Sequence, residues 1–297
     1  MLSEQDVFKR FAEISVWKRG DRRAPHKPLL LLYALARWSR GEGGEVSYVE
    51  AEEHLGPLLR EFGPTHTPRA EMPFWYLRND GVWFVADTER LGRRKNRTDP
   101  KRSELRKHNP VGGLLPEICD ALGHDRTLLR RVVAQLLNRN FPESLHEDIL
   151  TAVGLDSRDV EPAQVRRDAD FRSKVLRAYG HRCAVCGYDL RLGAADLALE
   201  AAHIKWHQAG GPDIESNGLA LCSLHHKMFD RGAFSISDDL RILVSQNVCG
   251  SFRLEESLLS FHGRDIGKPQ SPDYYPKDEY LRWHREEVFR SPARHPE

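Results

Sequence analysis

Apolar positions at helical spacing dominate the first 62 residues of the chain. Ser3 and Asp6 form a capping-box pattern in front of the first such run, which predicts a helix near the N-terminus. A second helix is predicted from Pro28 to about Arg40, because proline suits a first helical turn and glycines follow the run. The Ser47–Glu50 pattern opens a third predicted helix, which continues toward residue 62.

The pattern changes between residues 73 and 85. Pro73–Arg78 and Val82–Val85 are rich in aromatic and β-branched residues, and an Asn-Asp-Gly turn sequence separates them, which predicts a β-hairpin. Three helices followed by a hairpin are typical of a winged-helix-like module. Helices predicted over Leu114–Leu122 and Thr127–Asn138 complete this domain.

The second half of the chain mixes helices and strands. The polar stretch 156–167 is the predicted linker, so we expect one domain over residues 1–155 and another over residues 168–297. The elements expected in the second domain are helices over about 168–179, 217–231 and 277–289, and strands over 197–204, 234–236 and 242–244. The whole pattern predicts an α+β protein.

The composition fits two soluble globular domains. The chain has 297 residues, of which 40% are hydrophobic and 30% charged, and its mean hydropathy is −0.58; a domain takes roughly 150 residues. The longest apolar run, LLLLYAL over residues 29–35, is far shorter than the ~18 residues of a membrane span. The N-terminus lacks an apolar signal region, so we expect a cytoplasmic protein without a membrane partner.

The net charge of +1 conceals an uneven distribution. Residues 1–110 carry 21 basic and 16 acidic side chains, whereas residues 111–297 carry 24 and 28. Within the first part, Arg93–Lys107 contains eight basic and two acidic residues. Such a cluster is either a surface for contacts with phosphate groups or a solvated loop.

Four residues have the spacing of a structural zinc site. Cys183-x2-Cys186 and Cys222-x2-His225 are two ligand pairs separated by 35 residues, and Zn²⁺ favours such tetrahedral Cys3His sets. Four protein ligands leave no position for water, so we expect this zinc to support the fold and not to perform chemistry. The remaining two of the five cysteines lie outside this pattern.

A second constellation lies between and after these pairs. It contains AHI at residues 202–204, NGLALC at 217–222 and FDRG at 229–232, and it resembles the HNH endonuclease family over about residues 171–244. That resemblance implies a ββα-metal fold, in which two strands and a helix surround one divalent cation. The zinc pairs bracket this core as in the zinc-containing branch of the family, where the catalytic histidine directly follows the last zinc ligand.

The HNH resemblance assigns a role to each of four residues. His203 is the general base, since an imidazole can accept a proton near neutral pH. Asn217 orients the site by holding His203 or its loop. His226 ligates the catalytic cation, which is expected to be Mg²⁺ or Mn²⁺. Asp230, four residues later on the same helix face, is a candidate second ligand.

One position departs from the family pattern. Many members carry Asp or His directly before the base as a metal ligand, whereas Ala202 stands here. Asp230, Glu200 or His207 could take the place of that ligand, and the sequence leaves this choice open.

A second resemblance covers the N-terminal part of the chain. RRAPHKPLLLLYALARW over residues 22–38 and MPFWYLRNDGVWFV over residues 72–85 resemble the sulfur-binding domain of phosphorothioate-dependent, McrA-like type IV restriction endonucleases. In that family the domain binds DNA in which sulfur replaces a non-bridging phosphate oxygen, and the HNH domain cuts nearby. The resemblance implies a modification-dependent endonuclease whose partner is phosphorothioated duplex DNA.

Six residues are candidates for contacts with the modified backbone. Sulfur is larger, softer and less hydrated than oxygen, so a shallow apolar cup would favour it. The candidates are Pro73, Phe74 and Tyr76 for the cup, Arg23 and His26 for the remaining phosphate oxygens, and Arg97 for the backbone or a guanine edge. The alternative is that the prolines only start helices and the aromatic residues are hairpin core.

Three other functions stay open from the sequence. A nuclease with the same core could read methylated cytosine, a zinc protein could bind DNA as a regulator without cutting it, and a toxin-like HNH nuclease would cut unmodified DNA equally well. Double-strand cutting needs two sites, so we expect a homodimer, with the segment after residue 250 as a candidate interface.

Overall fold

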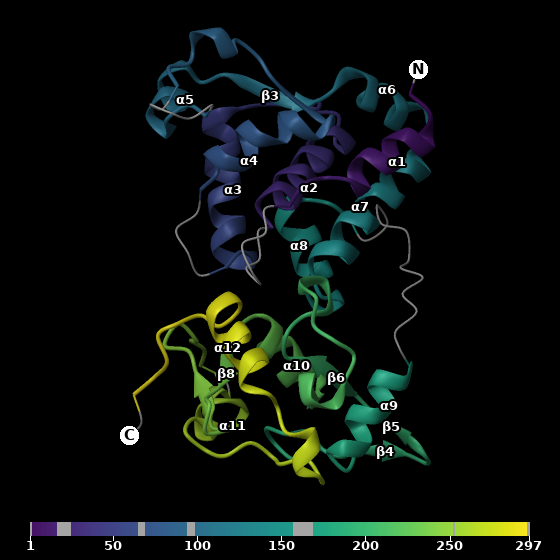
Figure 1. Ribbon diagram of the computed structural model, residues 1–297, viewed down its shortest axis with the longest axis vertical. Coiled ribbons are helices and arrows are strands. Elements are labelled where there is room, and N and C mark those ends of the chain that lie inside the picture. Colours follow the sequence, from purple (N-terminus) through teal and green to yellow (C-terminus); the bar gives the residue numbers. More distant parts are fainter. Residues whose placement is uncertain are drawn as a thin grey trace. The chain divides into compact units, whose positions relative to one another are not determined.

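The computed structural model describes residues 2–16, 25–64, 69–93, 99–156, 169–251 and 253–295. They form two compact units, one before residue 157 and one after residue 168 (Figure 1). Helices alternate with small antiparallel sheets in the described residues, which confirms the α+β class. Apart from Asp156, the predicted linker lies outside the described residues.

The N-terminal unit is mainly helical. Its helices are α1 (Glu4–Ala12), α2 (His26–Ser39), α3 (Tyr48–Phe62), α4 (Glu71–Tyr76), α5 (Arg102–His108), α6 (Pro116–His124), α7 (Arg126–Asn140) and α8 (His146–Val153). Its strands are β1 (Glu45–Ser47), β2 (Trp83–Val85) and β3 (Val111–Leu114). They form one antiparallel sheet in the order β1-β3-β2.

Helix α2 is the centre of this unit. Every residue from Pro28 to Ala36 is buried, and α3, α4, α7 and α8 all pack against the helix. A helix that is apolar on all sides needs neighbours all round, so the LLLLYAL run serves as a core helix. None of the described helices is both long and apolar enough to span a membrane.

Two of the predicted helix starts are confirmed in detail. The Ser3 side chain and the Asp6 side chain cap each other's backbone N–H groups at the start of α1. The Ser47 side chain accepts a hydrogen bond from the backbone of Glu50 at the start of α3.

The predicted hairpin over residues 73–85 is wrong. Its first half forms α4 followed by a 3₁₀ turn, Leu77–Asp80, and only β2 is a strand. Pro73 falls in the first turn of α4, where a missing N–H costs no helical hydrogen bond. Gly81 ends the turn in the left-handed conformation, with φ +68°. Because β2 pairs with β3, no wing is formed by residues 73–85.

The C-terminal unit contains short strands and few long helices. Its helices are α9 (Ala169–Ala178), α10 (Ser223–Asp230), α11 (Leu254–Ser257) and α12 (Asp278–Glu287). Its strands are β4 (Arg191–Leu192), β5 (Ala195–Asp196), β6 (Leu199–His203), β7 (Gly218–Cys222), β8 (Phe234–Ile236) and β9 (Ile242–Val244). They pair as the two-stranded sheets β4-β5, β6-β7 and β8-β9.

Strands β6 and β7 and helix α10 form the ββα unit that the sequence predicted. The strands are antiparallel, with His203 opposite Gly218, and α9 packs against both. The single helix predicted over 217–231 is wrong in its first part, because residues 218–222 form β7 and are buried throughout. A five-residue apolar run does not distinguish a buried strand from a helix by periodicity.

Candidate active site and metal centre

The four predicted zinc ligands lie together in the structure. The ligand atoms of Cys183, Cys186, Cys222 and His225 all lie within 4.8 Å of one another. The Nε2–H of His225 donates to the backbone carbonyl of Ser257 over 2.9 Å, which leaves Nδ1 facing the sulfur atoms. The three thiols share hydrogen bonds, which lower the pKa of Cys183 and raise the pKa values of Cys186 and Cys222. This cluster could hold a tetrahedral Zn²⁺.

Helix α10 joins this cluster to the predicted catalytic residues. His225 and His226 are consecutive residues of its first turns, and successive helical side chains point about 100° apart. One histidine therefore belongs to the cysteine cluster while the next faces another group of side chains. A change that moves α10 therefore moves both the cysteine cluster and the side chains around His226.

His226 lies between two carboxylates. Its Nδ1 is 2.6 Å from Oε2 of Glu200 on β6, and its Nε2 is 3.2 Å from Oδ2 of Asp230. The other oxygen of Asp230 accepts a 3.0 Å hydrogen bond from the indole N–H of Trp206. Burial lowers the pKa of His226, but the two carboxylates outweigh it and raise that pKa to about 10.

His203 ends β6, as predicted, and its ring is held on two sides. The ring of Phe171 from α9 stacks on it, with centroids 3.9 Å apart and planes at 11°. Its Nε2 is 2.7 Å from Oδ1 of Asp213, a residue that the sequence analysis did not single out. Burial lowers the pKa of His203, while the bond to Asp213 acts in the opposite direction.

Asn217 holds the loop that follows His203. Its fully buried amide accepts from the backbone N–H of Lys205 over 2.9 Å and donates to the carbonyls of Lys205 and Pro212 over 3.0 and 2.9 Å. Gly211 lies in this loop because a Cβ there would approach the Lys205 carbonyl oxygen to 1.8 Å. Of the two roles left open for Asn217, the contacts agree with holding the loop.

The six residues predicted to contact DNA differ in whether the structure describes them and in how exposed they are. Arg23 and Arg97 lie outside the described residues. His26 is the first residue of α2, and Pro73 is buried in the first turn of α4. Tyr76 is half-buried, and its hydroxyl donates to Oδ1 of Asp99 over 3.1 Å.

Phe74 does not fit the predicted surface cup. Its side chain is fully buried, and its ring makes edge contacts with the rings of Tyr48 and Trp83. A ring without exposed surface cannot contact DNA, so Phe74 is a core residue. Its position in the sequence could not reveal this, because α4 was expected to be a strand with a different inward face.

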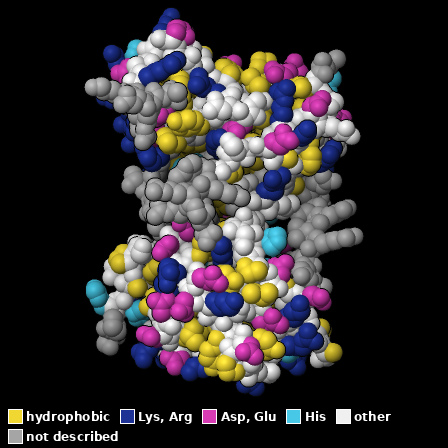
Figure 2. Space-filling model, in the orientation of Figure 1, with side chains coloured by type: hydrophobic (Ala, Val, Ile, Leu, Met, Phe, Trp, Pro, Cys, Tyr) yellow, Lys and Arg dark blue, Asp and Glu magenta, His cyan; other side chains and the backbone are white. Residues whose placement is uncertain are grey.

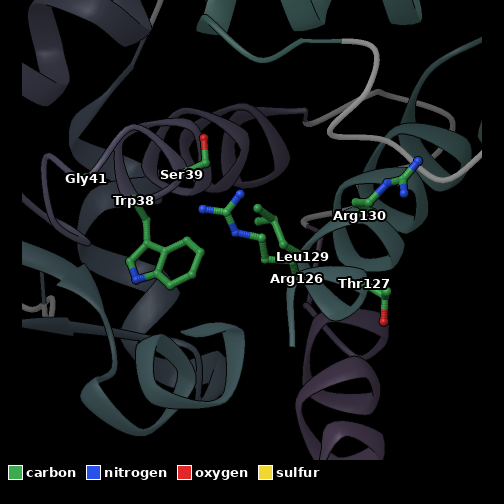
Figure 3. Close-up of a pocket in the computed structure, with 7 residues that line it drawn as sticks. All are labelled: Trp38, Ser39, Gly41, Arg126, Thr127, Leu129 and Arg130. Carbon is green, nitrogen blue, oxygen red and sulfur yellow. The ribbon is translucent and has the colours of Figure 1, made fainter. Parts of the chain in front are cut away.

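A pocket lies elsewhere in the N-terminal unit, between the end of α2 and the start of α7 (Figure 3). The residues that line it are Trp38, Ser39, Gly41, Arg126, Thr127, Leu129 and Arg130. None of the predicted site residues is among them.

Comparisons with known proteins cover both halves of the chain. A family profile described as "ScoMcrA-like, DNA sulfur-binding domain" matches residues 4–158, and one described as "HNH endonuclease" matches residues 183–237. Among curated proteins, none matches this chain.

Several solved structures resemble part of the chain. The sulfur-binding domain of ScoMcrA complexed with phosphorothioated DNA is 23% identical, with 50% of this chain and 94% of that chain covered and a TM-score of 0.45. The corresponding domain of SprMcrA, also complexed with phosphorothioated DNA, is 25% identical, with coverages of 52% and 95% and a TM-score of 0.44. The phosphorothioation-dependent type IV restriction endonuclease ScoMcrA is 21% identical, with coverages of 52% and 30% and a TM-score of 0.42.

The sulfur-binding match spans more than half of the chain, and the HNH match spans the ββα unit with its cysteine cluster. The chain therefore belongs to the family of proteins with a ScoMcrA-like DNA sulfur-binding domain, joined here to an HNH endonuclease domain.

Proposed function

We propose that this protein is a modification-dependent DNA endonuclease, which binds phosphorothioated duplex DNA with residues 1–155 and hydrolyses nearby phosphodiester bonds with residues 168–297. The observation that carries the proposal is the presence, in one chain, of a DNA sulfur-binding domain and an HNH domain that contains a ββα unit. The first domain would select the DNA, and the second would cut it.

In the proposed reaction His203 acts as the general base. Its ring is 23% exposed, so water can reach it, and its lowered pKa keeps it neutral near pH 7. Asn217 keeps the following loop in place behind it.

His226 and Asp230 are the proposed ligands of a catalytic Mg²⁺ or Mn²⁺, which would displace the proton that the two neighbouring carboxylates favour on His226. Two ligand atoms about 2.1 Å from one octahedral ion and at right angles to each other are about 3.0 Å apart, and the relevant atoms of these side chains are 3.2 Å apart. Trp206 donates to the other oxygen of Asp230, and Glu200 would orient the imidazole from its other nitrogen. The bound cation would polarise the scissile phosphate and stabilise the leaving 3′ oxygen.

For the cysteine cluster we propose Zn²⁺ in a purely structural role. Four protein ligands would complete a tetrahedral shell, and Cys183 and Cys222 among them belong to the buried core of the unit. The zinc would fix the position of α10 relative to β7, and so fix the position of His226 relative to β6.

The proposed DNA-reading set is Arg23, His26, Tyr76 and Arg97, without Pro73 and Phe74, whose side chains are buried. Sulfur is weakly hydrated, so the half-buried ring of Tyr76 would favour it over oxygen. The charged and polar members would bind the remaining oxygens of the same or neighbouring phosphates. Of the described members, His26 is the first residue of α2 and Tyr76 is the last residue of α4.

Glu52 orients two further arginines, Arg102 and Arg106, whose side chains reach the surface. Glu52 of α3 is 9% exposed and accepts the Nε–H groups of Arg102 and Arg106 from α5, while each arginine side chain stays at least half exposed. Neither guanidinium has another hydrogen bond to a described residue. Figure 2 shows Lys and Arg side chains gathered at the edge of the N-terminal unit where α5 lies. We propose that their outer N–H groups hold the DNA backbone.

A binding competition tests which DNA modification the N-terminal domain recognises. Full-length protein with His203→Ala, which should bind without cutting, is titrated into labelled duplex against unlabelled duplexes that carry phosphorothioate, methylcytosine or no modification. We expect the phosphorothioate duplex to compete at least tenfold better than the other two. Stronger competition by methylcytosine would establish the alternative reader, and equal competition by all three would indicate a nonspecific nuclease.

The homodimer belongs to the same proposal, because cutting both strands requires two active sites. Sedimentation of the protein with and without phosphorothioated duplex measures it directly. A protein that stays monomeric on DNA while it cuts both strands would contradict the dimer.

A further inference from the structure

Two contacts fix the ring of His203 in the structure. Phe171 covers one face at 3.9 Å, and Asp213 accepts a hydrogen bond from one edge at 2.7 Å. No other hydrogen bond ties the ring to the part of the chain that the structure describes. The two contacts together set the position, the plane and the rotation of the imidazole.

The contact with Asp213 also sets which nitrogen carries the proton. A carboxylate accepts but cannot donate, so the neutral ring places its proton on Nε2. The lone pair is then on Nδ1, at the opposite side of the ring. A histidine oriented in this way is ready to accept a proton without first changing tautomer.

We propose that Asp213 is a positioning residue for hydrolysis: it holds His203 in the Nε2–H tautomer, with Nδ1 as the base that activates water. The proposal rests on the proposed endonuclease function. In the step, Nδ1 takes a proton from water, the water oxygen bonds to phosphorus, and the bond from phosphorus to the 3′ oxygen breaks. The leaving oxygen takes up a proton from solvent, and His203 later returns its own proton to solvent, so the products are a 3′ hydroxyl and a 5′ phosphate.

Asp213 keeps its place through the loop and not through the histidine alone. The Asn217 amide bonds the carbonyl of Pro212, the residue directly before Asp213. Gly210 adopts φ +80°, a conformation that other residues rarely accept, so the loop can turn back toward β6. The Asp213 side chain is 31% exposed, so the contact with His203 lies at the surface of the loop.

The charges around His203 give the sign of the pH dependence. Asp213 and Asp230 raise its pKa, whereas His207, whose ring centroid is 6.1 Å away, and burial lower it. From α9 the uncharged ring of Phe171 stacks on it. Asp213→Asn removes one of the charges that raise the pKa, so the pH at which the base becomes active should fall.

The test measures single-turnover cleavage of phosphorothioated duplex between pH 5 and 9, with Asp213→Asn, Asp213→Glu and a control, Asp239→Asn. Asp239 is an exposed residue of the turn between β8 and β9, so its variant makes the same chemical change away from the site. Equal zinc content and equal DNA affinity identify variants that are folded.

We expect Asp213→Asn to lower the plateau rate about 10–100-fold, by analogy with the loss of carboxylates that orient metal-bound histidines, and to shift the acid limb of the profile to lower pH. Asp213→Glu should recover part of the rate, and Asp239→Asn should match wild type. An Asp213→Asn rate within threefold of wild type would overturn the proposal. A lower plateau with an acid limb moved toward the ordinary histidine pKa of ~6.5 would also overturn it, because that indicates an exposed, disordered ring.

Nitrogen-15 NMR of the histidine side chains tests the same contact without cleavage. Comparison with His203→Ala identifies the resonances of this ring. Wild type should show the Nε2–H tautomer with a pKa below 6.5, and Asp213→Asn a lower pKa still. A predominant Nδ1–H tautomer, or an unchanged pKa in Asp213→Asn, would reject the role of Asp213. Wild type that shows the expected NMR result but cuts no DNA would reject the proposed function alone.

Discussion

The loop that carries Asp213 depends on one buried amide, and this dependence allows a quantitative prediction. Asn217 makes three hydrogen bonds of 2.9–3.0 Å to the backbone of Lys205 and Pro212, and its side chain is fully buried. Each such bond contributes about 1 kcal/mol net. Asn217→Ala should therefore make opening of the loop about 3 kcal/mol easier, which is about a 100-fold larger opening constant.

Asn217→Asp should be worse than Asn217→Ala, although aspartate has nearly the same shape. The Oδ1 bond to Lys205 can persist, but a carboxylate oxygen replaces the amide NH₂ and faces two carbonyl oxygens. A buried charge without a donor costs several kcal/mol. Protonation of the new carboxyl restores one donor, so its penalty should be smaller at pH 5 than at pH 8.

Hydrogen exchange of the full-length protein measures these effects. The backbone N–H groups of Ala209, Gly210 and Gly211 donate within the loop and report its opening. Their exchange should accelerate about 100-fold in Asn217→Ala and further in Asn217→Asp. Asn247→Ala, which loses only contacts of 3.4 and 3.5 Å, serves as the control. Exchange within threefold of wild type, or an Asn217→Asp variant more protected than Asn217→Ala, would refute this reasoning.

Three further predictions follow from other contacts. Cys222→Ser should lower the zinc content measured by atomic absorption and abolish cleavage while leaving binding of phosphorothioated DNA within threefold, because the cysteine cluster belongs to the C-terminal unit; unchanged zinc content would contradict the ligand set. Arg102→Ala and Arg106→Ala should each weaken binding of modified and plain duplex by the same factor in anisotropy titrations, and each should reduce the slope of log affinity against log salt concentration by about 1. A loss of affinity confined to modified DNA would instead assign these arginines to recognition of the sulfur atom. Gly211→Ala should slow cleavage at least tenfold with zinc content unchanged, since its Cβ would meet the Lys205 carbonyl at 1.8 Å; a rate within twofold of wild type would show that the loop can rearrange without effect.

The sequence predicted those elements whose local signals agree with their packing. Ser3 and Ser47 cap helices because their side chains can satisfy backbone N–H groups wherever the helix lies. The zinc pairs were predictable because C-x2-C and C-x2-H spacing sets ligand geometry locally. The i, i+4 spacing of His226 and Asp230 likewise placed them together on α10 before any tertiary contact was considered.

The errors arose where tertiary contacts decide between two local structures. Aromatic residues around Pro73 favour a strand locally, but burial of Phe74 against Trp83 of β2 and Gly112 of β3 favours α4. The apolar run of β7 has no periodicity that separates strand from helix. Asp213 belongs to a loop without a motif, so only the folded loop reveals that it meets His203.

The most direct measurement of the central claim is cleavage of two duplexes of identical sequence, one with a single phosphorothioate and one without, by wild type and His203→Ala in the presence of Mg²⁺ or Mn²⁺. We predict that wild type cuts the phosphorothioated duplex at least tenfold faster than the plain one. His203→Ala should bind the modified duplex with wild-type affinity and cut neither. Equal cutting of both duplexes by wild type, or undiminished cutting by His203→Ala, would contradict the account.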